Sequence, residues 1–216
     1  MATLGLDIKH IAIEGGIGVG KTTLARGLAK KINASLLLET IDDNPFLALF
    51  YQDPERHGLS VQLSFLFSRL KQWQSLVQQD LFHSVMVSDY LFAKDRLFAM
   101  TNLSDEEFAL YDQVAQLVAI DLPKPDLVIF LQSSAETALS RVKKRNRDIE
   151  KDITIDYINQ VTATYDNFFF HYQDTPLLVV QTDRINFADR PDALDMLIQR
   201  IGHMRSGTEF WADFSE

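Results

Sequence analysis

Short apolar runs rich in Ile, Val and Leu alternate along the chain with longer stretches of mixed character. The runs cover residues 8–13, 35–38, 85–88, 127–131 and 177–180. Each run is nearly continuous in apolar residues, which is typical of strands that are buried on both faces. The stretches between the runs are long enough to hold crossover helices. The pattern therefore predicts an α/β fold with a five-stranded parallel sheet flanked by helices.

The segments between the runs carry helix signals. Serine and glutamate are spaced as in a capping box in residues 133–136 and again in residues 104–107. Apolar positions between residues 60 and 80 follow a helical period, which predicts the longest helix there. Residues 205–216 combine polar and aromatic residues without a clear period. We expect them to form a C-terminal tail.

Length and composition point to one globular domain. The chain has 216 residues, of which 46% are hydrophobic and 24% charged, and no repeat or linker divides it. We therefore expect residues 1–216 to form a single domain. No apolar run approaches the ~18 residues of a membrane span, and no secretory signal is evident at the start of the chain. These features predict a cytoplasmic protein without a membrane partner.

The charge balance limits the class of ligand. Lys and Arg number 21 against 30 Asp and Glu, which gives a net charge of −9. This balance disfavours binding to a nucleic acid polymer, which depends on neutralising phosphates. The chain has no cysteine, so disulfides and thiolate chemistry are excluded. A small-molecule ligand is the expectation that remains.

A phosphate-binding motif follows the first apolar run. Residues 15–22 fit G-x-x-x-x-G-K-[ST], with an apolar run before them and a helical pattern after them. Glycines let backbone N–H groups face phosphates, the lysine can bridge the terminal phosphates, and the threonine hydroxyl can ligate Mg²⁺. The alternative is a glycine-rich turn without a ligand. The candidate nucleotide-binding residues are Gly15, Gly16, Gly18, Gly20, Lys21, Thr22 and Thr23.

Two carboxylates follow later strands of the predicted sheet. Glu39 follows the second run and Asp89 the third, so both should face the crevice at the carboxyl ends of the strands. Glu39 could accept the proton of an attacking hydroxyl, and Asp89 could hold Mg²⁺. The alternatives are a solvated glutamate at a strand end and an aspartate that caps a helix.

Polar residues on two helical segments suggest further contacts. Gln62 and Arg69 are seven positions apart and share a face with Phe65, which suits a flat heterocycle with donors and acceptors on its edge. A polar helix flank is the alternative. Arg141 and Arg145 also share a face and could close over a transferring phosphoryl group. The alternative for them is favourable charge at a helix C-terminus.

Together these residues resemble the deoxynucleoside kinases, the family of deoxycytidine, deoxyguanosine and bacterial deoxyadenosine kinases. The likeness covers roughly residues 9–187. It implies a P-loop kinase fold with an arginine-rich lid over about residues 141–153. It also implies transfer of the ATP γ-phosphoryl group to the 5′-hydroxyl of a deoxynucleoside in nucleotide salvage, with Mg²⁺, by a homodimer.

The resemblance assigns roles to individual residues. Tyr51 and Glu150 would contact the sugar 3′-hydroxyl, and Phe98 would stack on the base. The implied catalytic residues are Glu39, Arg141, Arg145 and Lys21, with Arg147 on the nucleotide and Thr22 and Asp89 on the metal. The implied substrate-binding residues are Glu39, Tyr51, Gln62, Arg69, Asp89, Asp95, Phe98 and Glu150.

The chain departs from the family pattern in two places. Members usually have an arginine directly after the acidic residue that follows the third strand, whereas Tyr90 follows Asp89 here. We expect Arg96 or a lid arginine to take over the task of that arginine. Val61 stands where the family has an aromatic residue, so the aromatic contact with the base is expected to be one-sided or to be completed by another group such as Phe65.

The resemblance also bears on the substrate. The pair Arg69 and Asp95 is similar to the pair of the deoxycytidine and deoxyguanosine kinases, which disfavours thymidine. A purine deoxynucleoside or deoxycytidine is the expected acceptor. One alternative is a monophosphate kinase of the thymidylate kinase type, although residues 40–80 hold few of the cations that it would need. The other is a nucleotide-binding regulatory module that has lost catalysis.

Overall fold

The protein is described by a computed structural model that covers residues 8–41, 43–79, 85–118, 124–204 and 206–212. Its strands are β1 (His10–Gly15), β2 (Ser35–Leu37), β3 (Met86–Ser88), β4 (Leu127–Gln132), β5 (Leu177–Gln181) and β6 (Thr208–Ala212). Its helices are α1 (Lys21–Ile32), α2 (Leu47–Gln52), α3 (Pro54–Gln79), α4 (Lys94–Asn102), α5 (Asp105–Val118), α6 (Ala135–Arg145), the 3₁₀ turn η1 (Asp148–Glu150), α7 (Ile155–Phe170) and α8 (Pro191–His203).

The described strands form one parallel sheet in the order β2-β3-β1-β4-β5-β6. Each of the apolar runs found in the sequence corresponds to one of the first five strands, so the parallel α/β fold is confirmed. The expected number of strands is wrong, because Thr208–Ala212 lies in the expected tail and pairs with β5 as a sixth strand.

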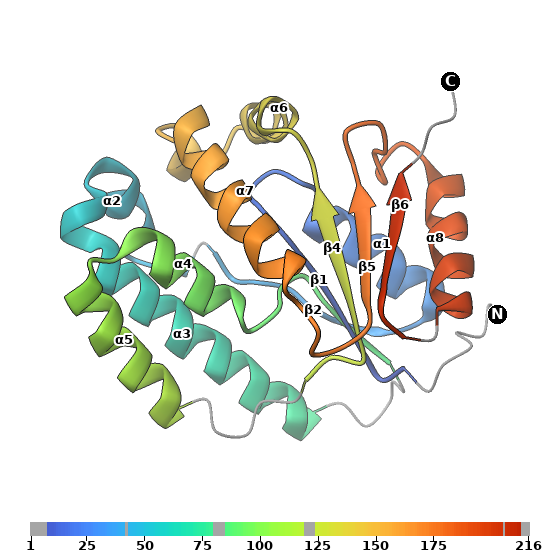
Figure 1. The fold of residues 1–216 in the computed structure, drawn as a ribbon, viewed down its shortest axis with the longest axis horizontal. Coiled ribbons are helices and arrows are strands. Elements are labelled where there is room, and N and C mark those ends of the chain that lie inside the picture. Colours follow the sequence, from blue (N-terminus) through green and yellow to red (C-terminus); the bar gives the residue numbers. More distant parts are fainter. Residues whose placement is uncertain (1–7, 42, 80–84, 119–123, 205, 213–216) are drawn as a thin grey trace.

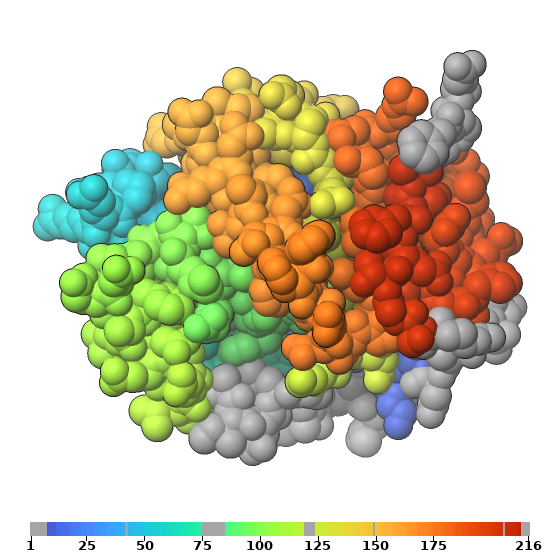
Figure 2. Space-filling view, in the orientation of Figure 1, coloured from blue at the N-terminus to red at the C-terminus, as the bar shows by residue number. Residues whose placement is uncertain are grey.

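Helices cover both faces of the sheet (Figure 1). On one face, α1 and α8 pack their apolar residues against β1, β4 and β5. On the other face, α7 packs Tyr165 and Phe169 against Phe130 of β4, and the ring centroids of Phe130 and Phe169 are 4.1 Å apart. Helix α4 contacts both α7 and α3, and α5 packs outside them. Figure 2 shows α2 projecting from this body.

Local signals explain where several helices begin. Ser104 and Glu107 form the predicted capping box, in which each side chain accepts a hydrogen bond from the backbone N–H of the other. At α6 the capping residue is Ser134, whose Oγ accepts from the N–H of Thr137 at 3.3 Å. The long helix α3 begins at Pro54, earlier than the periodicity indicated, and residue 80 lies outside the described residues.

The strand order determines where a ligand can bind. The chain runs from β1 to β2 and β3 on one side and then crosses to β4 on the other, so the strand order reverses beside β1. Ligands of open parallel sheets bind at such a reversal, outside the carboxyl ends of the strands. The glycine-rich loop, Glu39 and Asp89 follow β1, β2 and β3 respectively, so the topology brings them together. Within the described residues, no helix has the length and apolar character needed to cross a membrane.

The sixth strand can be tested with two neighbouring aromatic residues. Trp211 is 5% exposed and packs in the core beside α8, whereas Phe210 points away and is 73% exposed. We expect Trp211→Ala to lower the free energy of unfolding by about 3–5 kcal/mol, because it leaves a cavity in the core. Phe210→Ala is the control and should change it by less than about 0.5 kcal/mol. Chemical denaturation measures both, and equal losses would argue against the pairing of β6.

Candidate active site

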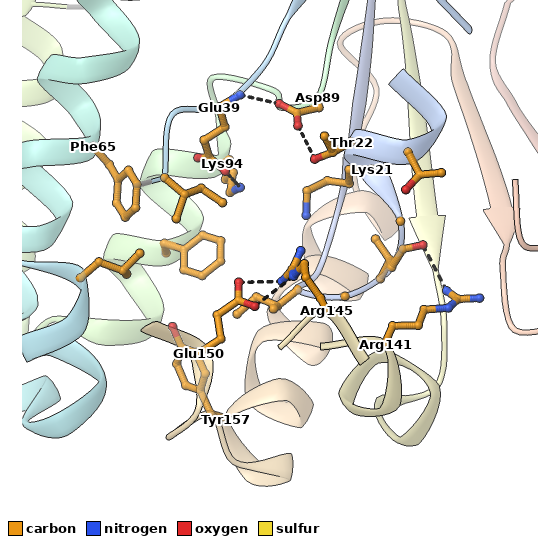
Figure 3. Close-up of a pocket in the computed structure, with 18 of the residues that line it drawn as sticks. Lys21, Thr22, Glu39, Phe65, Asp89, Lys94, Arg141, Arg145, Glu150 and Tyr157 are labelled. Carbon is orange, nitrogen blue, oxygen red and sulfur yellow. Dashed lines mark hydrogen bonds and ion pairs between the residues drawn. The ribbon is translucent and has the colours of Figure 1, made fainter. Parts of the chain in front are cut away.

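A pocket of about 440 Å³ opens at the carboxyl ends of β1, β2 and β3 (Figure 3). Its walls come from the glycine-rich loop, from α3 and α4, and from the lid segment that includes α6 and η1. The predicted site residues that line it are Gly18, Gly20, Lys21, Thr22, Thr23, Glu39, Tyr51, Gln62, Arg69, Asp89, Phe98, Arg141, Arg145 and Glu150. The predicted site residues outside its lining are Gly15, Gly16, Asp95 and Arg147.

The glycine-rich loop connects β1 to α1 and forms one wall of the pocket. Gly18 has φ +82°, and a Cβ atom there would lie 2.4 Å from the carbonyl oxygen of Ala138 in α6. Only glycine therefore lets the loop adopt this conformation and pack against the lid helix. Gly20, with φ +105°, directly precedes the first residue of α1, Lys21. The sequence motif thus has the strand–loop–helix context that phosphate binding requires.

Lys21 lies inside the loop. Its Nζ donates hydrogen bonds to the carbonyl oxygens of Gly15 and Gly16, each at 2.8 Å. Burial lowers the pKa of Lys21 to about 8, and the positive charge of Lys94 acts in the same direction. Nearby carboxylates, among them Glu39, oppose the shift. The loop therefore holds a half-buried cation that a phosphate would stabilise.

Asp89 connects the loop to the strand that carries Glu39. Its Oδ2 accepts a hydrogen bond from the Thr22 hydroxyl at 2.6 Å, and its Oδ1 accepts one from the backbone N–H of Glu39 at 2.7 Å. The carboxylate is thus held between the start of α1 and the end of β2. In the described part of the chain, no group of three or more His, Asp or Glu side chains is placed to hold a metal ion by itself.

Glu39 is a buried carboxylate between two cations. Oε1 accepts from the Arg69 guanidinium, and Oε2 accepts from Lys94 Nζ at 2.7 Å. Burial alone would raise the pKa of Glu39, but the charges and hydrogen bonds of Arg69 and Lys94 outweigh it and hold this pKa well below its usual range. Glu39 is therefore an anion at neutral pH, in the same pocket as Lys21.

Lys94 was missed by the sequence analysis. It stands at the start of α4, four positions before Phe98, and this spacing puts both side chains on the pocket face of the helix. This spacing from Phe98, a predicted site residue, was the sequence feature from which Lys94 could have been found. Arg96, which we expected to replace the missing arginine, instead pairs with Asp112 on the outer side, where its side chain is 57% exposed. Arg96 therefore does not take over that task, and Lys94 is the α4 cation beside Glu39.

The far end of the pocket combines aromatic and polar groups. Gln62 is 3% exposed, and the Arg69 guanidinium lies 5.0 Å from the centre of the Phe65 ring. Asp95 pairs with Arg69 and fixes its orientation. Burial raises the pKa of Asp95 to about 6, although the charge of Arg69 opposes the shift. Among the described groups, Gln62 Oε1, Arg69 Nε and Asp95 Oδ2 are buried polar atoms without a hydrogen-bond partner.

The lid arginines have different surroundings. Arg145 forms two hydrogen bonds with the Glu150 carboxylate, at 3.0 and 2.6 Å, and Glu150 is buried. Arg147 Nη1 is 3.9 Å from the same carboxylate, and the Arg147 side chain is 38% exposed. Arg141 instead donates to carbonyl oxygens, among them that of Thr182 at 2.6 Å, and so ties the lid helix to the loop after β5. The lid thus presents Arg145 and Glu150 to the pocket, while Arg141 is held to one side (Figure 3).

Tyr51 and Tyr157 form an aromatic wall below the lid. Their ring centroids are 6.2 Å apart with an edge-on arrangement, and Phe50 packs against both. Burial raises the pKa of the Tyr51 hydroxyl above its usual range and the pKa of Tyr157 to about 12. Both hydroxyl groups are therefore neutral hydrogen-bonding groups at physiological pH.

The fold and the loop define the class of protein. A parallel sheet with a glycine-rich phosphate loop after its first strand, and arginines on a lid helix above the loop, is the arrangement of a P-loop kinase. Comparison with known proteins then gives the family. A sequence model described as "Deoxynucleoside kinase" matches residues 11–204. The chain belongs to the deoxynucleoside kinase family and is an enzyme of nucleotide salvage.

Individual relatives agree with this assignment. A deoxyadenosine kinase from Dictyostelium discoideum is 36% identical over 90% of this chain and 79% of its own length. A deoxyguanosine kinase from Bacillus subtilis is 35% identical over 80% of this chain and 84% of its own length. Among solved structures, deoxyadenosine kinase from M. mycoides with bound dATP has a TM-score of 0.76 and 25% identity. That likeness covers 88% of this chain and 99% of the solved one.

The contact between the loop and the lid helix can be tested with two glycines. We expect Gly18→Ala to destabilise the protein by about 1–3 kcal/mol and to weaken ADP binding about tenfold, because the new methyl group meets the Ala138 carbonyl oxygen. Gly27→Ala is the control, since its methyl group meets only a Leu194 side-chain atom at 3.4 Å. Because Gly27 lies in the middle of α1, Gly27→Ala should raise the free energy of unfolding by about 0.5–1 kcal/mol. Thermal unfolding and calorimetric titration give both values, and a tolerated Gly18→Ala would contradict the close packing.

Proposed function

We propose that the enzyme transfers the γ-phosphoryl group of ATP to the 5′-hydroxyl of a deoxynucleoside, with purine deoxynucleosides or deoxycytidine as acceptors. The observation that carries this proposal is the position of Glu39, a buried anion in the pocket that also contains the phosphate loop and Lys21. A carboxylate placed there can receive the proton of an attacking hydroxyl. The names of the relatives and the bound nucleotides of the M. mycoides structures support it.

The reaction can be written with the groups in the pocket. The backbone of residues 15–22 and Lys21 hold the donor phosphates, and the 5′-oxygen forms a bond to the γ-phosphorus. The bond from that phosphorus to the bridging oxygen breaks, and ADP leaves with this oxygen. Glu39 receives the hydroxyl proton. Arg145 balances the charge of the phosphoryl group from the lid, and closure of the lid excludes water.

The arrangement of Thr22 and Asp89 fits the expected Mg²⁺. A hydroxyl and a carboxylate oxygen lie 2.6 Å apart at the start of α1. Magnesium prefers oxygen ligands and usually takes one or two from the protein, with phosphates and water completing the set. When bound, the ion would neutralise charge on the β- and γ-phosphates.

The rest of the pocket suits a nucleoside. Gln62 and Arg69 offer an amide and a guanidinium to the edge of a base, and Phe65 and Phe98 offer aromatic surface to its faces. Tyr51 and Glu150 line the same pocket, and their proposed role is to contact the sugar 3′-hydroxyl. The preference for a purine or deoxycytidine rests on the Arg69–Asp95 pair and on the names of the relatives.

The alternative of a monophosphate kinase is less well supported. Its acceptor carries a phosphate and needs cations that are available for it. On the acceptor side, Arg69 is engaged by Asp95 and Glu39, and Glu39 itself would repel a phosphate. The homodimer stays a prediction from the resemblance, and light scattering of the 24.7 kDa chain tests it. The cytoplasmic location stays a prediction from the sequence.

A substrate panel tests the proposed function. With Mg·ATP, we expect 5′-phosphorylation of deoxyadenosine, deoxyguanosine or deoxycytidine, weaker turnover of thymidine and of the ribonucleosides, and no turnover of deoxynucleoside monophosphates. The physical reason is that the pocket offers hydrogen bonds to a purine or cytosine edge and places a carboxylate at the acceptor oxygen. Chromatography of the reaction products shows which compounds of the panel are phosphorylated. Turnover of monophosphates alone would replace the proposal by the monophosphate kinase alternative.

Replacing the proposed base tests the mechanism. Glu39→Gln keeps the shape of the side chain but cannot accept the proton, so kcat should fall about 100-fold or more. Binding of the deoxynucleoside should change by no more than about threefold, because Glu39 acts mainly in the transition state. Glu136→Gln, an exposed position on α6, is the matched control and should leave both values unchanged. Near-normal turnover of Glu39→Gln would remove Glu39 from this step.

A further inference from the structure

Lys94 is a buried cation at the centre of the pocket. Its side chain is 8% exposed, and its Nζ donates to Glu39 Oε2 at 2.7 Å. The ammonium group also lies 5.5 Å from the centre of the Phe98 ring, which lines the same pocket. Lys94 therefore belongs to the site itself and is not a surface lysine that happens to bend inward.

The ion pair with Glu39 does not by itself distinguish Lys94 from Arg69. Glu39 already pairs with Arg69, so Lys94 adds a second buried cation to the same carboxylate. Burying a charge costs several kcal/mol in desolvation, and such a group is expected to have partners that compensate for it. Arg69 and Lys94 together balance the charges of Glu39 and Asp95. What distinguishes Lys94 from Arg69 is its place near Lys21 of the phosphate loop, where its charge can also act on a bound anion.

The charges around Lys94 indicate where that anion binds. The groups around it come from several elements and are Glu14 on β1, Lys21 on α1, Glu39 after β2, and Asp95 and Phe98 on α4. Arg69 on α3 holds the same Glu39 carboxylate. Lys94 is close enough to Lys21 for its charge to lower the pKa of Lys21, although burial is the larger cause. In Figure 3, Lys94 lies beside Glu39, whereas Lys21 lies across the pocket from both. Two ammonium groups that face one space form an anion site between the phosphate loop and the proposed base.

We propose that Lys94 is a catalytic residue whose ammonium group binds the phosphoryl group during its transfer from ATP to the acceptor. This inference rests on the proposed function. The 5′-oxygen forms its bond to the γ-phosphorus, the bond to the bridging oxygen of ADP breaks, and the hydroxyl proton goes to Glu39. Lys94 keeps its three protons and moves a hydrogen bond from Glu39 to a phosphoryl oxygen. Glu39 then has one cation fewer beside it as it accepts the proton.

This assignment accounts for the departure from the family pattern. The arginine expected directly after Asp89 is replaced by Tyr90, which is fully buried and donates its hydroxyl to Gln72 at 3.1 Å. Arg96 is engaged on the outer surface by Asp112. Lys94, in the first turn of α4, supplies a positive charge to the pocket from a different position in the chain.

Three variants of Lys94 and one control variant test the charge of Lys94 separately from its hydrogen bond to Glu39. Lys94→Gln keeps a donor to Glu39 but removes the charge, and we expect kcat with deoxyadenosine, or with the best acceptor of the panel, to fall about 100-fold or more. Lys94→Arg restores a cation and should recover at least tenfold of that loss. Lys30→Gln, at an exposed position of α1, is the matched control and should keep the kcat of the unchanged enzyme. Lys94→Met provides a second uncharged variant should Lys94→Gln be unstable.

Binding of the product separates a contact with the phosphoryl group from a structural effect. By calorimetry, Lys94→Gln should bind the deoxynucleoside within about threefold of the unchanged enzyme, but its 5′-monophosphate about tenfold or more weakly, because a charge-assisted hydrogen bond is lost. A merely structural lysine would weaken both ligands equally and lower the melting temperature.

The outcomes distinguish this inference from the proposed function. If the unchanged enzyme phosphorylates no member of the deoxynucleoside panel, the proposed function fails. If it is active and Lys94→Gln retains kcat within about threefold, the inference about Lys94 is overturned while the proposed function stands. Equal weakening of deoxynucleoside and monophosphate binding overturns it in the same way.

Discussion

The burial of the Glu39 carboxylate between Arg69 and Lys94 is the constraint on which the rest of the site depends. A kinase pocket has to hold a negatively charged base close to a negatively charged donor, and the two repel each other in a medium of low dielectric. Cations on both sides of Glu39 reduce this repulsion and satisfy both of its oxygens. A buried carboxylate with one partner removed would be costly, so Glu39 and its cations have to be considered together.

The sheet topology explains how residues far apart in the sequence assemble around this carboxylate. Parallel strands end at one edge, so the loop after β1, Glu39 after β2 and Asp89 after β3 meet there without long connections. Asp89 then joins them directly, because its two oxygens accept from Thr22 and from the backbone of Glu39. Helices α3 and α4 pack side by side and deliver Arg69 and Lys94 from the opposite wall. The position of the Glu39 carboxylate is thus set by strand ends, and its electrostatic surroundings by helices.

The sequence predicted the parts of this arrangement that local patterns determine. Continuous apolar runs identified β1 to β5, but β6 was missed because only Trp211 of its five residues is buried and the alternation is short. The loop and Glu39 were found from motif and strand position. Lys94 was missed, and Arg96 was one of the two alternatives named, because each helix position is rotated by about 100° from the one before it and periodicity alone does not say which position faces a pocket. That choice depends on tertiary packing of α4 against α3 and α7.

Arg69 connects recognition of the acceptor to the chemical step. One side of its guanidinium contacts Asp95, the other contacts Glu39, and its buried Nε has no hydrogen-bond partner among the described residues. A buried donor that lacks a partner favours a ligand that supplies a hydrogen-bond acceptor. An analogue without that acceptor binds less well, because the donor stays unsatisfied. Since the same guanidinium holds Glu39, the proposed proton acceptor, a nucleobase that pairs badly with Arg69 would also leave Glu39 less firmly positioned. Specificity at this site should therefore appear in kcat as well as in binding.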